Sequence, residues 1–226
     1  MDRPRLLDLF CGAGGAARGY QLAGFHVTGI DIHPQPRYAG DLFIQGDALA
    51  YVRDHGHEYD AIHASPPCQA YTPLKATTGK TYPDLVAATR AALVASGRPW
   101  IIENVPGAPL VAPITLCGAM FPGLRVYRHR LFESSEPLSA PPHPKHVVKA
   151  TGTQRQRRAH YEAGGFITIT GDVGTYCGPA MAITWLTGNE LSQAIPPAYT
   201  HHLGQQLLRP QERPHVPHQP QLLDLR

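Results

Sequence analysis

Two short segments of this chain carry side chains that could perform covalent chemistry. The segment SPPCQ (Ser65–Gln69) follows a strand-like stretch, and its two prolines would fix the position of the Cys68 thiol. Glu103 ends the next apolar stretch. Because ligands bind at the carboxyl ends of parallel strands, we expect Cys68 and Glu103 at one edge of a sheet. A lone cysteine is more often a small buried apolar residue, and a strand-end acid can simply face solvent, so both assignments depend on this placement.

A glycine-rich segment near the N-terminus, DLFCGAGG (Asp8–Gly15), could bind a nucleotide-like ligand. Its glycines would let a ligand approach the backbone closely, and the helix that follows would offer free N–H groups. It is not a dinucleotide fingerprint, because Ala17 replaces the third glycine. Asp31 ends the second strand, where an acid commonly binds ribose hydroxyls, and Asp47 follows the third, within reach of an adenine amino group. Each aspartate alone could be a helix cap, but together the three features favour an adenosyl cofactor.

Strand and helix signals alternate through the first two-thirds of the chain, which predicts an α/β fold with a mostly parallel sheet. The expected strands are Arg5–Asp8, His26–Asp31, Leu42–Ile44, Tyr59–Ala64 and Trp100–Glu103. The expected helices between them are Gly14–Ala23, Ala48–Asp54 and Tyr82–Ala95.

The composition changes at Glu133, where several prolines precede a basic stretch. Between Pro137 and Tyr161 there are five basic and no acidic residues, as expected of a segment that meets phosphate, although a solvated loop is the plainer interpretation. A β-branched stretch (166–170) follows, and Thr187–Leu208 predicts a capped helix, a Pro-Pro interruption and a second helix. The proline-rich residues 209–226 are expected to form a flexible tail.

With 226 residues, a net charge of +3 and no long apolar stretch, the chain has the composition of one soluble domain. Its N-terminus is unlike a signal peptide, so we expect a cytoplasmic protein with four reduced cysteines. The cysteines form no C-x-x-C pair, so the sequence predicts no metal site.

In their order along the chain, DLFCGAGG, PPCQ (66–69), ENV (103–105) and RHR (128–130) resemble the motifs of DNA cytosine-5 methyltransferases. The resemblance covers roughly residues 5–132 and 184–208. The chain departs from the family pattern where Val126 replaces a glutamine before the arginines, and where Asp31 replaces the usual glutamate. The closing motif has Ser192-Gln193 in place of a Gly-Asn pair. The segment available for target recognition is only about 50 residues long.

The resemblance implies a Rossmann-like S-adenosylmethionine-dependent methyltransferase fold with a small recognition insertion. It divides the chain into a catalytic and cofactor-binding part (1–132), a short target-recognition insertion (133–183) and C-terminal helices that complete the catalytic part (184–208). The expected protein is a monomer, although a dimer is compatible with the sequence.

The resemblance also implies roles for individual residues. Cys68 would attack carbon 6 of a flipped cytosine, Glu103 would hold ring nitrogen 3 and the exocyclic amine, and Arg130 would bind the base carbonyl with support from Arg128. The residues expected to bind S-adenosylmethionine are Phe10, Cys11, Gly12, Ala13, Gly14, Gly15, Asp31, Ile32, Asp47, Ala48 and Pro66.

Double-stranded DNA is the expected partner, contacted by the basic stretch. The candidate residues in that stretch are Lys145, Lys149, Arg155, Arg157 and Arg158. So short a segment predicts a target site of about two to four base pairs, because it can present few side chains to base edges. Two alternatives stay open: a related enzyme that methylates RNA, in particular tRNA, and an inactive DNA-binding decoy. The biological role could be restriction-modification or modification of phage DNA.

Overall fold

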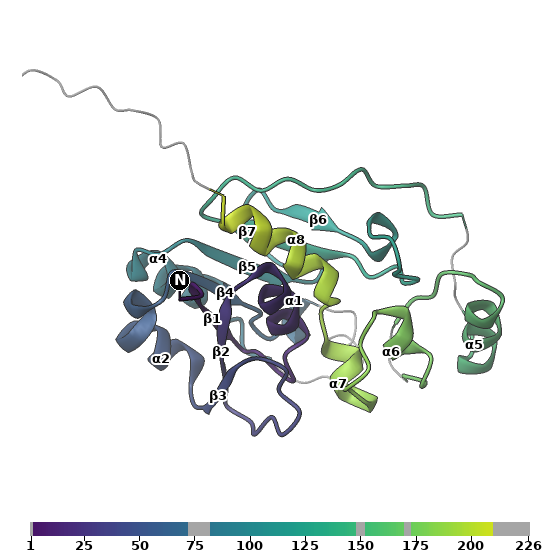
Figure 1. Cartoon of the computed structure of the whole chain (residues 1–226), viewed down its shortest axis with the longest axis horizontal. Coiled ribbons are helices and arrows are strands. Elements are labelled where there is room, and N and C mark those ends of the chain that lie inside the picture. The colour runs from purple at the N-terminus through teal and green to yellow at the C-terminus, as the bar shows by residue number, and fades with distance from the viewer. Residues whose placement is uncertain (1, 72–81, 148–151, 170–172, 210–226) are drawn as a thin grey trace, which may run out of the picture.

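The computed structural model describes residues 2–71, 82–147, 152–169 and 173–209 of the chain. Its centre is a seven-stranded sheet with the order β3-β2-β1-β4-β5-β7-β6 (Figure 1). The strands are β1 (Arg5–Leu9), β2 (His26–Asp31), β3 (Leu42–Gln45), β4 (Ala61–Ala64), β5 (Trp100–Asn104), β6 (Ile114–Leu116) and β7 (Arg130–Ser134). Strands β1 to β5 pair in parallel, whereas β7 runs antiparallel to both β5 and β6. The structure confirms the expected α/β fold with a mostly parallel sheet.

Helices cover both faces of the sheet (Figure 1). The helices are α1 (Gly15–Ala23), α2 (Ala48–His55), α4 (Val86–Ser96), α5 (Gln154–Glu162), α6 (Cys177–Ala180), α7 (Gly188–Gln193) and α8 (Pro197–Leu207), and the short 3-10 turns are Gly56–Glu58, Gln69–Tyr71 and Gly118–Met120. Side chains of β1 alternate between the two faces. Leu6 packs with Tyr20 of α1, whereas Leu7 packs with Val52 of α2 and Leu93 of α4.

The C-terminal helices pack against the first helix of the chain. The Thr200 hydroxyl in α8 donates a hydrogen bond to the Ala16 carbonyl at 2.8 Å, and a Cβ at Gly19 would lie 2.1 Å from the Pro197 carbonyl oxygen. Helix α7 begins with a capping box between Thr187 and Glu190. The expected pair of helices around the Pro-Pro interruption is therefore confirmed.

Three differences from the expected elements exceed one residue. Helix α4 begins at Val86 rather than Tyr82, because a residue before proline disfavours helical geometry and the Asp84 side chain binds the Val86 N–H. Strand β4 begins at Ala61, after the 3-10 turn Gly56–Glu58. In the stretch 166–170, the described residues form only an isolated bridge from Ile167 to Val126.

Strand β7 continues past residue 132, where the sequence placed the start of the recognition insertion. Glu133 pairs with Ile102 of β5. It also forms an ion pair with Arg90 of α4 at 2.6 Å. None of the helices among the described residues has the length and apolar composition needed to cross a bilayer.

Candidate active site

The loops after β4 and β5 lie at the carboxyl edge of the parallel strands and are joined by a buried side chain. Asn104, which is 1% exposed, donates from Nδ2 to the Pro66 carbonyl at 3.0 Å. Its Oδ1 accepts the Val105 N–H at 2.9 Å. Both polar atoms of the Asn104 side chain therefore form hydrogen bonds with the backbone. These bonds fix the loop that carries Cys68 against the end of β5.

Glu103 is the buried acid of this edge. The residue is 6% exposed, and its Oε1 lies 2.9 Å from Nε of Arg130 at the start of β7. Burial raises the pKa of Glu103 above its ordinary value, although Arg130, Arg128 and a hydrogen bond from Ser65 oppose that effect. The Glu103 carboxyl group therefore holds a proton more readily than an exposed glutamate does.

A chain of buried hydrogen bonds leads to Glu103. The Tyr20 hydroxyl lies 3.0 Å from His63 Nδ1, and His63 Nε2 lies 3.0 Å from the Ser65 oxygen. Burial lowers the pKa of His63 to about 3, so the imidazole is neutral. If Ser65 donates to Glu103, His63 must donate from Nε2 and accept at Nδ1 from Tyr20, and every group is satisfied. The sequence analysis missed this chain, because His63 and Tyr20 lie within an ordinary strand and helix.

Cys68 is a half-buried free thiol. Burial and the nearby Glu103 raise the pKa of its thiol, whereas Arg130 and Arg128 lower it. The structure therefore brings the predicted Cys68, Glu103, Arg128 and Arg130 into one electrostatic group. The Cys68 thiol is mostly protonated at neutral pH, and the positive charges of Arg128 and Arg130 stabilise its thiolate form.

Arg128 is 3% exposed and links this group to the C-terminal helices. Its Nη2 donates to the Ser192 carbonyl at the end of α7 at 2.6 Å. Its own carbonyl accepts the Tyr199 hydroxyl of α8 at 2.7 Å. Burial lowers the pKa of Arg128 to about 9, with the charge of Arg130 adding to this effect. Arg128 is thus tied to both α7 and α8, and Tyr199 is a contributor that the sequence did not single out.

The glycine-rich loop after β1 has a strained start. Phe10 has a φ of 56°, which is uncommon for a non-glycine residue and concentrates at functional sites. Gly14 caps α1 with a φ of 83°, and a Cβ at Gly15 would lie 2.6 Å from the Ile195 carbonyl oxygen. These two glycines are therefore needed for the protein's own packing. Gly12 differs, because a Cβ there would meet nothing within 4 Å.

Asp31 orders the same loop from the end of β2. Its carboxylate accepts the backbone N–H of Gly12 at 3.0 Å and that of His33 at 2.9 Å. The neighbouring Ile32 is a large apolar side chain that is 62% exposed. The remaining loop residues are tied into the fold: Cys11 donates its backbone N–H to Ile30, and Ala13 accepts from Trp185.

Asp47 caps α2, because its Oδ1 accepts the Ala50 N–H at 2.8 Å. This is the alternative that the sequence left open for an aspartate at this position, and it occupies one of the two carboxylate oxygens. Ala48 begins the helix and is buried.

Asp8 in β1 is a buried acid. The sequence analysis named it only as the first residue of the glycine-rich segment and gave it no role of its own. It is fully buried, and neither carboxylate oxygen has a hydrogen-bond partner among the described residues. Burial raises its pKa well above the ordinary value, and the negative charges of Asp31 and Glu103 add to this. An unpartnered carboxyl beneath a glycine-rich loop is costly to fold and is the kind of group that a bound ligand can satisfy.

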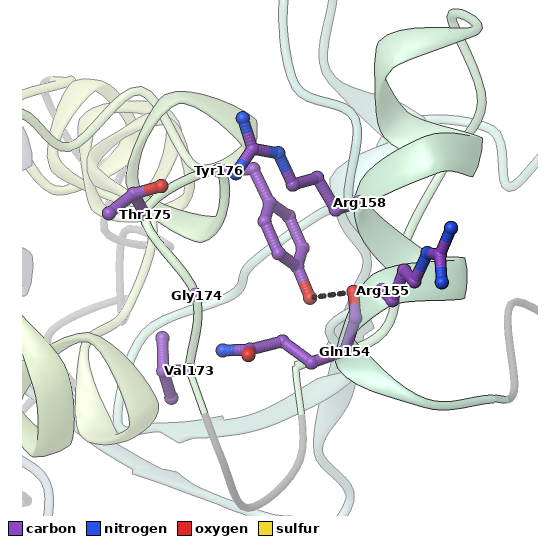
Figure 2. A pocket seen from close by; sticks show the side chains of 7 residues that line it. All are labelled: Gln154, Arg155, Arg158, Val173, Gly174, Thr175 and Tyr176. Carbon is purple, nitrogen blue, oxygen red and sulfur yellow. Dashed lines mark hydrogen bonds between the residues drawn. The ribbon is translucent and has the colours of Figure 1, made fainter.

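The predicted basic residues divide into exposed and buried ones. Arg155 and Arg158 lie on the exposed side of α5 and line an open pocket of about 480 Å³ with Tyr176 (Figure 2). Arg157 is only 8% exposed and turns inward, with Nη1 3.5 Å from the Thr168 carbonyl. Arg157 therefore does not lie with the other two on the exposed face. Lys145 is exposed, and Lys149 lies outside the described residues.

Neither a protein-family model nor a curated relative matches the chain by sequence. Solved structures do match it. A prophage-encoded protein of E. coli, described as a DNA modification methyltransferase, has 13% identity and a TM-score of 0.62, with 90% of this chain and 98% of that chain covered.

Two further structures cover 92% of this chain and 98% of their own. They are the Dnmt2 methyltransferase of S. pombe, with 14% identity and a TM-score of 0.53, and the methyltransferase EhMeth of Entamoeba histolytica, with 11% identity and a TM-score of 0.51. At such identities the likeness shows the fold alone: this chain has the Rossmann-like α/β fold that these methyltransferases share.

Proposed function

We propose that this chain is a DNA cytosine-5 methyltransferase that uses Cys68 as its nucleophile. The observation that carries the proposal is the buried ion pair of Glu103 and Arg130 at 2.9 Å, beside a thiol held on a proline-braced loop at the carboxyl edge of the sheet. The similar fold of DNA-modifying and other methyltransferases supports the assignment.

The reaction begins at carbon 6 of cytosine, because carbon 5 alone is a poor nucleophile. The Cys68 thiolate adds to carbon 6, and the electron pair of the 5,6 double bond moves into the ring. Glu103 holds ring nitrogen 3 and the exocyclic amine, where that charge develops, and its raised pKa lets it share a proton there. Carbon 5 then accepts the methyl group. Loss of the carbon 5 proton and expulsion of Cys68 restore the aromatic ring.

Arg130 binds the carbonyl oxygen of the base while it remains paired with Glu103, and Arg128 holds the arginine loop on α7 and α8. Because Cys68 is half-buried at the sheet edge, a stacked base cannot reach it. The target nucleotide must therefore be flipped out of the duplex, which costs a few kcal/mol.

The loops after β1 and β2 fit S-adenosylmethionine, which supplies the methyl group when bound. The exposed Ile32 and the strained Phe10 offer apolar surfaces to an adenine ring, and Asp31 lies where ribose hydroxyls would bind. The open space at Gly12 lets a ligand approach the backbone. The unpartnered Asp8 gives this loop a buried acceptor.

Double-stranded DNA is the proposed substrate, and the exposed Lys145, Arg155 and Arg158 are its proposed phosphate and base contacts. Because so short a segment can present few side chains to base edges, the target site would span about two to four base pairs, with a guanine beside the modified cytosine.

A mechanism-based trap tests the nucleophile. The wild-type protein should form a covalent complex with duplex DNA that contains 5-fluorocytosine, because fluorine at carbon 5 cannot leave as a proton does. Cys68→Ser should form no complex and transfer no labelled methyl group, since a serine hydroxyl is far less nucleophilic at neutral pH. Cys177→Ala serves as a control, because Cys177 is a buried thiol in the core at the start of α6.

The same labelled transfer, run with duplex DNA and with tRNA, tests the substrate. Transfer to DNA with a Cys68 adduct supports the proposal. Transfer to tRNA alone would make the chain an RNA methyltransferase, and turnover in Cys68→Ser would remove Cys68 from the mechanism. Bisulfite sequencing of DNA from cells that express the protein would give the target site, and a six-base consensus would contradict the short-site proposal.

A further inference from the structure

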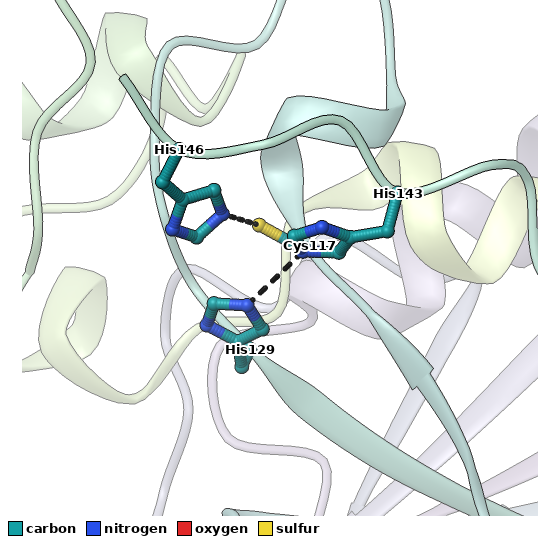
Figure 3. A group of neighbouring side chains, drawn as sticks. All are labelled: Cys117, His129, His143 and His146. Atoms are coloured by element: carbon teal, nitrogen blue, oxygen red, sulfur yellow. Dashed lines mark hydrogen bonds between the residues drawn. The ribbon is translucent and has the colours of Figure 1, made fainter. Parts of the chain in front are cut away.

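Four metal-binding side chains converge outside the candidate active site (Figure 3). They are Cys117, His129, His143 and His146, and their ligand atoms all lie within 4.8 Å of one another. Cys117 follows β6, His129 lies between the two active-site arginines, and the last two lie in the proline-rich segment. The sequence search missed this group because it tested the cysteines only for C-x-x-C spacing.

The separations of the ligand atoms suit a single small ion. Cys117 Sγ lies 3.3 Å from His146 Nε2, and His129 Nε2 lies 3.2 Å from His143 Nε2. A tetrahedral zinc site with bonds of about 2.0–2.3 Å separates its ligand atoms by about 3.3–3.8 Å. Both measured separations are therefore near the edge length of such a tetrahedron.

Hydrogen bonding within the group does not explain the convergence. Hydrogen bonds join the four side chains in two separate pairs, His129 with His143 and Cys117 with His146, and two separate pairs do not require all four ligand atoms to lie within 4.8 Å of one another. Among the ion pairs formed by described residues, none joins these histidines to a carboxylate. A single metal ion bound by all four side chains accounts for their convergence.

We propose that Cys117, His129, His143 and His146 form a structural zinc site. One thiolate and three imidazoles are ligands that zinc accepts in tetrahedral geometry, and four protein ligands leave no open position for catalysis. The softness of the thiolate disfavours magnesium and calcium, which take oxygen ligands.

The surroundings of the group resemble the outer shell of a metal site. The backbone N–H groups of Ala119 and Arg128 donate to the Cys117 side chain. The His146 ring stacks on Tyr127 at a centroid distance of 3.8 Å, and Tyr127 stacks in turn on Phe166. These contacts orient the sulfur and one imidazole toward the shared point.

The site would anchor a segment that has little other support. Residues 137–147 have no helix or strand and form no backbone–backbone hydrogen bonds with other described residues. Ser139 is held by Gln206 of α8, at 2.8 Å from its N–H. Beyond that point, His143 and His146 are the side chains that reach back to β6 and the arginine loop. Zinc would thus fix the start of the recognition segment to the loop that carries Arg128 and Arg130.

The zinc content of the untagged full-length protein tests this directly. Protein purified from zinc-supplemented medium should carry about one zinc per chain by plasma mass spectrometry. His143→Ala should lose it, with an affinity fall of more than about 100-fold, since second-shell changes alone cost 10–100-fold. The His143 side chain is exposed, so this variant should fold. Replacement by Co²⁺ should give a thiolate-to-metal charge-transfer band that Cys117→Ser removes.

A matched control exists in the chain, because the spacing H-x-x-H of His143 and His146 recurs at His215 and His218, outside the described residues. The double variant His215→Ala/His218→Ala should keep its zinc, and so should Cys68→Ser, which separates this proposal from the catalytic one. Wild-type protein that takes up no zinc would overturn the site. So would zinc that survives His143→Ala and Cys117→Ser but is lost from the control.

Discussion

The carboxyl edge of the sheet and the recognition segment hold their polar side chains in opposite ways. At the edge, Glu103, Asn104 and Arg128 are almost fully buried, and each is bound to groups from other elements. In the recognition segment, Arg155 and Arg158 extend from α5 into solvent. Helix α5 buries only Arg157.

The two regions differ in how much free energy it costs to place their charged side chains. Desolvation of the charged Glu103 and Arg128 and of the polar Asn104 is unfavourable, but it fixes their positions and makes the charges act strongly on each other. Exposed arginines cost little to fold and interact weakly with one another, so each adds a small, salt-dependent amount to binding. Substitutions at the edge should therefore have large and coupled effects, and those on α5 small and additive ones.

The largest effect is expected at Glu103. In Glu103→Gln, methyl transfer should fall by about 10²–10⁴-fold, because the proton shared with ring nitrogen 3 is lost. The same change should lower the pKa of Cys68, since the negative charge of Glu103 raises it and Arg130 remains. The reactive form is the thiolate, so alkylation of Cys68 by iodoacetamide should move to lower pH while catalysis falls.

A lower methyl-transfer rate together with a more reactive Cys68 distinguishes a catalytic loss from general damage to the fold, which would not make Cys68 reactive at lower pH. Glu162→Gln, an exposed acid on α5, is the control and should change neither the alkylation profile nor the transfer rate at saturating DNA. An unchanged or higher Cys68 pKa in Glu103→Gln would mean that the two groups are not coupled as the geometry indicates.

An intermediate effect is expected at the cofactor loops. Asp31→Ala should weaken S-adenosylmethionine binding by about 1–3 kcal/mol, because it loses a polar partner and releases the Gly12 and His33 amides. Asp47→Ala should weaken binding on the same scale and also lower the free energy of unfolding by about 1 kcal/mol through loss of the α2 cap.

Asp47→Ser distinguishes the two roles of Asp47, because serine restores the cap but does not reach the adenine. Calorimetry should then show weak binding with normal stability. If both Asp47→Ser and Asp47→Ala bind S-adenosylmethionine with wild-type affinity, Asp47 acts only as a helix cap and is not part of the cofactor site.

The parallel half of the sheet could be predicted from the sequence because its signals are local. Buried strands appear as apolar runs, and the loops after them carry the motifs, so topology alone brings Cys68 and Glu103 to one edge. The helix near residue 86 shows the limit of local signals. Its apolar pattern was correct, but Pro83 and Asp84 moved its start by four residues.

The contacts that complete the site could not be predicted, because they join residues far apart in the chain. Arg128 is held by Ser192 and Tyr199, and nothing in the sequence near the arginines identifies these partners. The side-chain direction of Arg157 was also hidden. In a run of arginines on a helix, the composition does not tell which one faces inward.

The smallest effects are expected on α5, where the exposed arginines can be compared with the buried one. Arg155→Ala and Arg158→Ala should each reduce the salt dependence of DNA binding by about one counterion, with little change in stability. Arg157→Ala should instead lower the free energy of unfolding, because its side chain is packed inside. Titrations at several salt concentrations and thermal unfolding measure the two effects separately.

Glu162 offers a test of opposite sign. It forms an exposed ion pair with Arg158 at 2.8 Å, one helical turn away, and such exposed pairs contribute little to stability. A phosphate that binds Arg158 must compete with this carboxylate. Glu162→Gln should therefore tighten DNA binding slightly at low salt, and the gain should vanish in the double variant with Arg158→Ala. An equal gain with and without Arg158 would mean that Glu162 acts only through general repulsion, and that Arg158 does not contact the backbone.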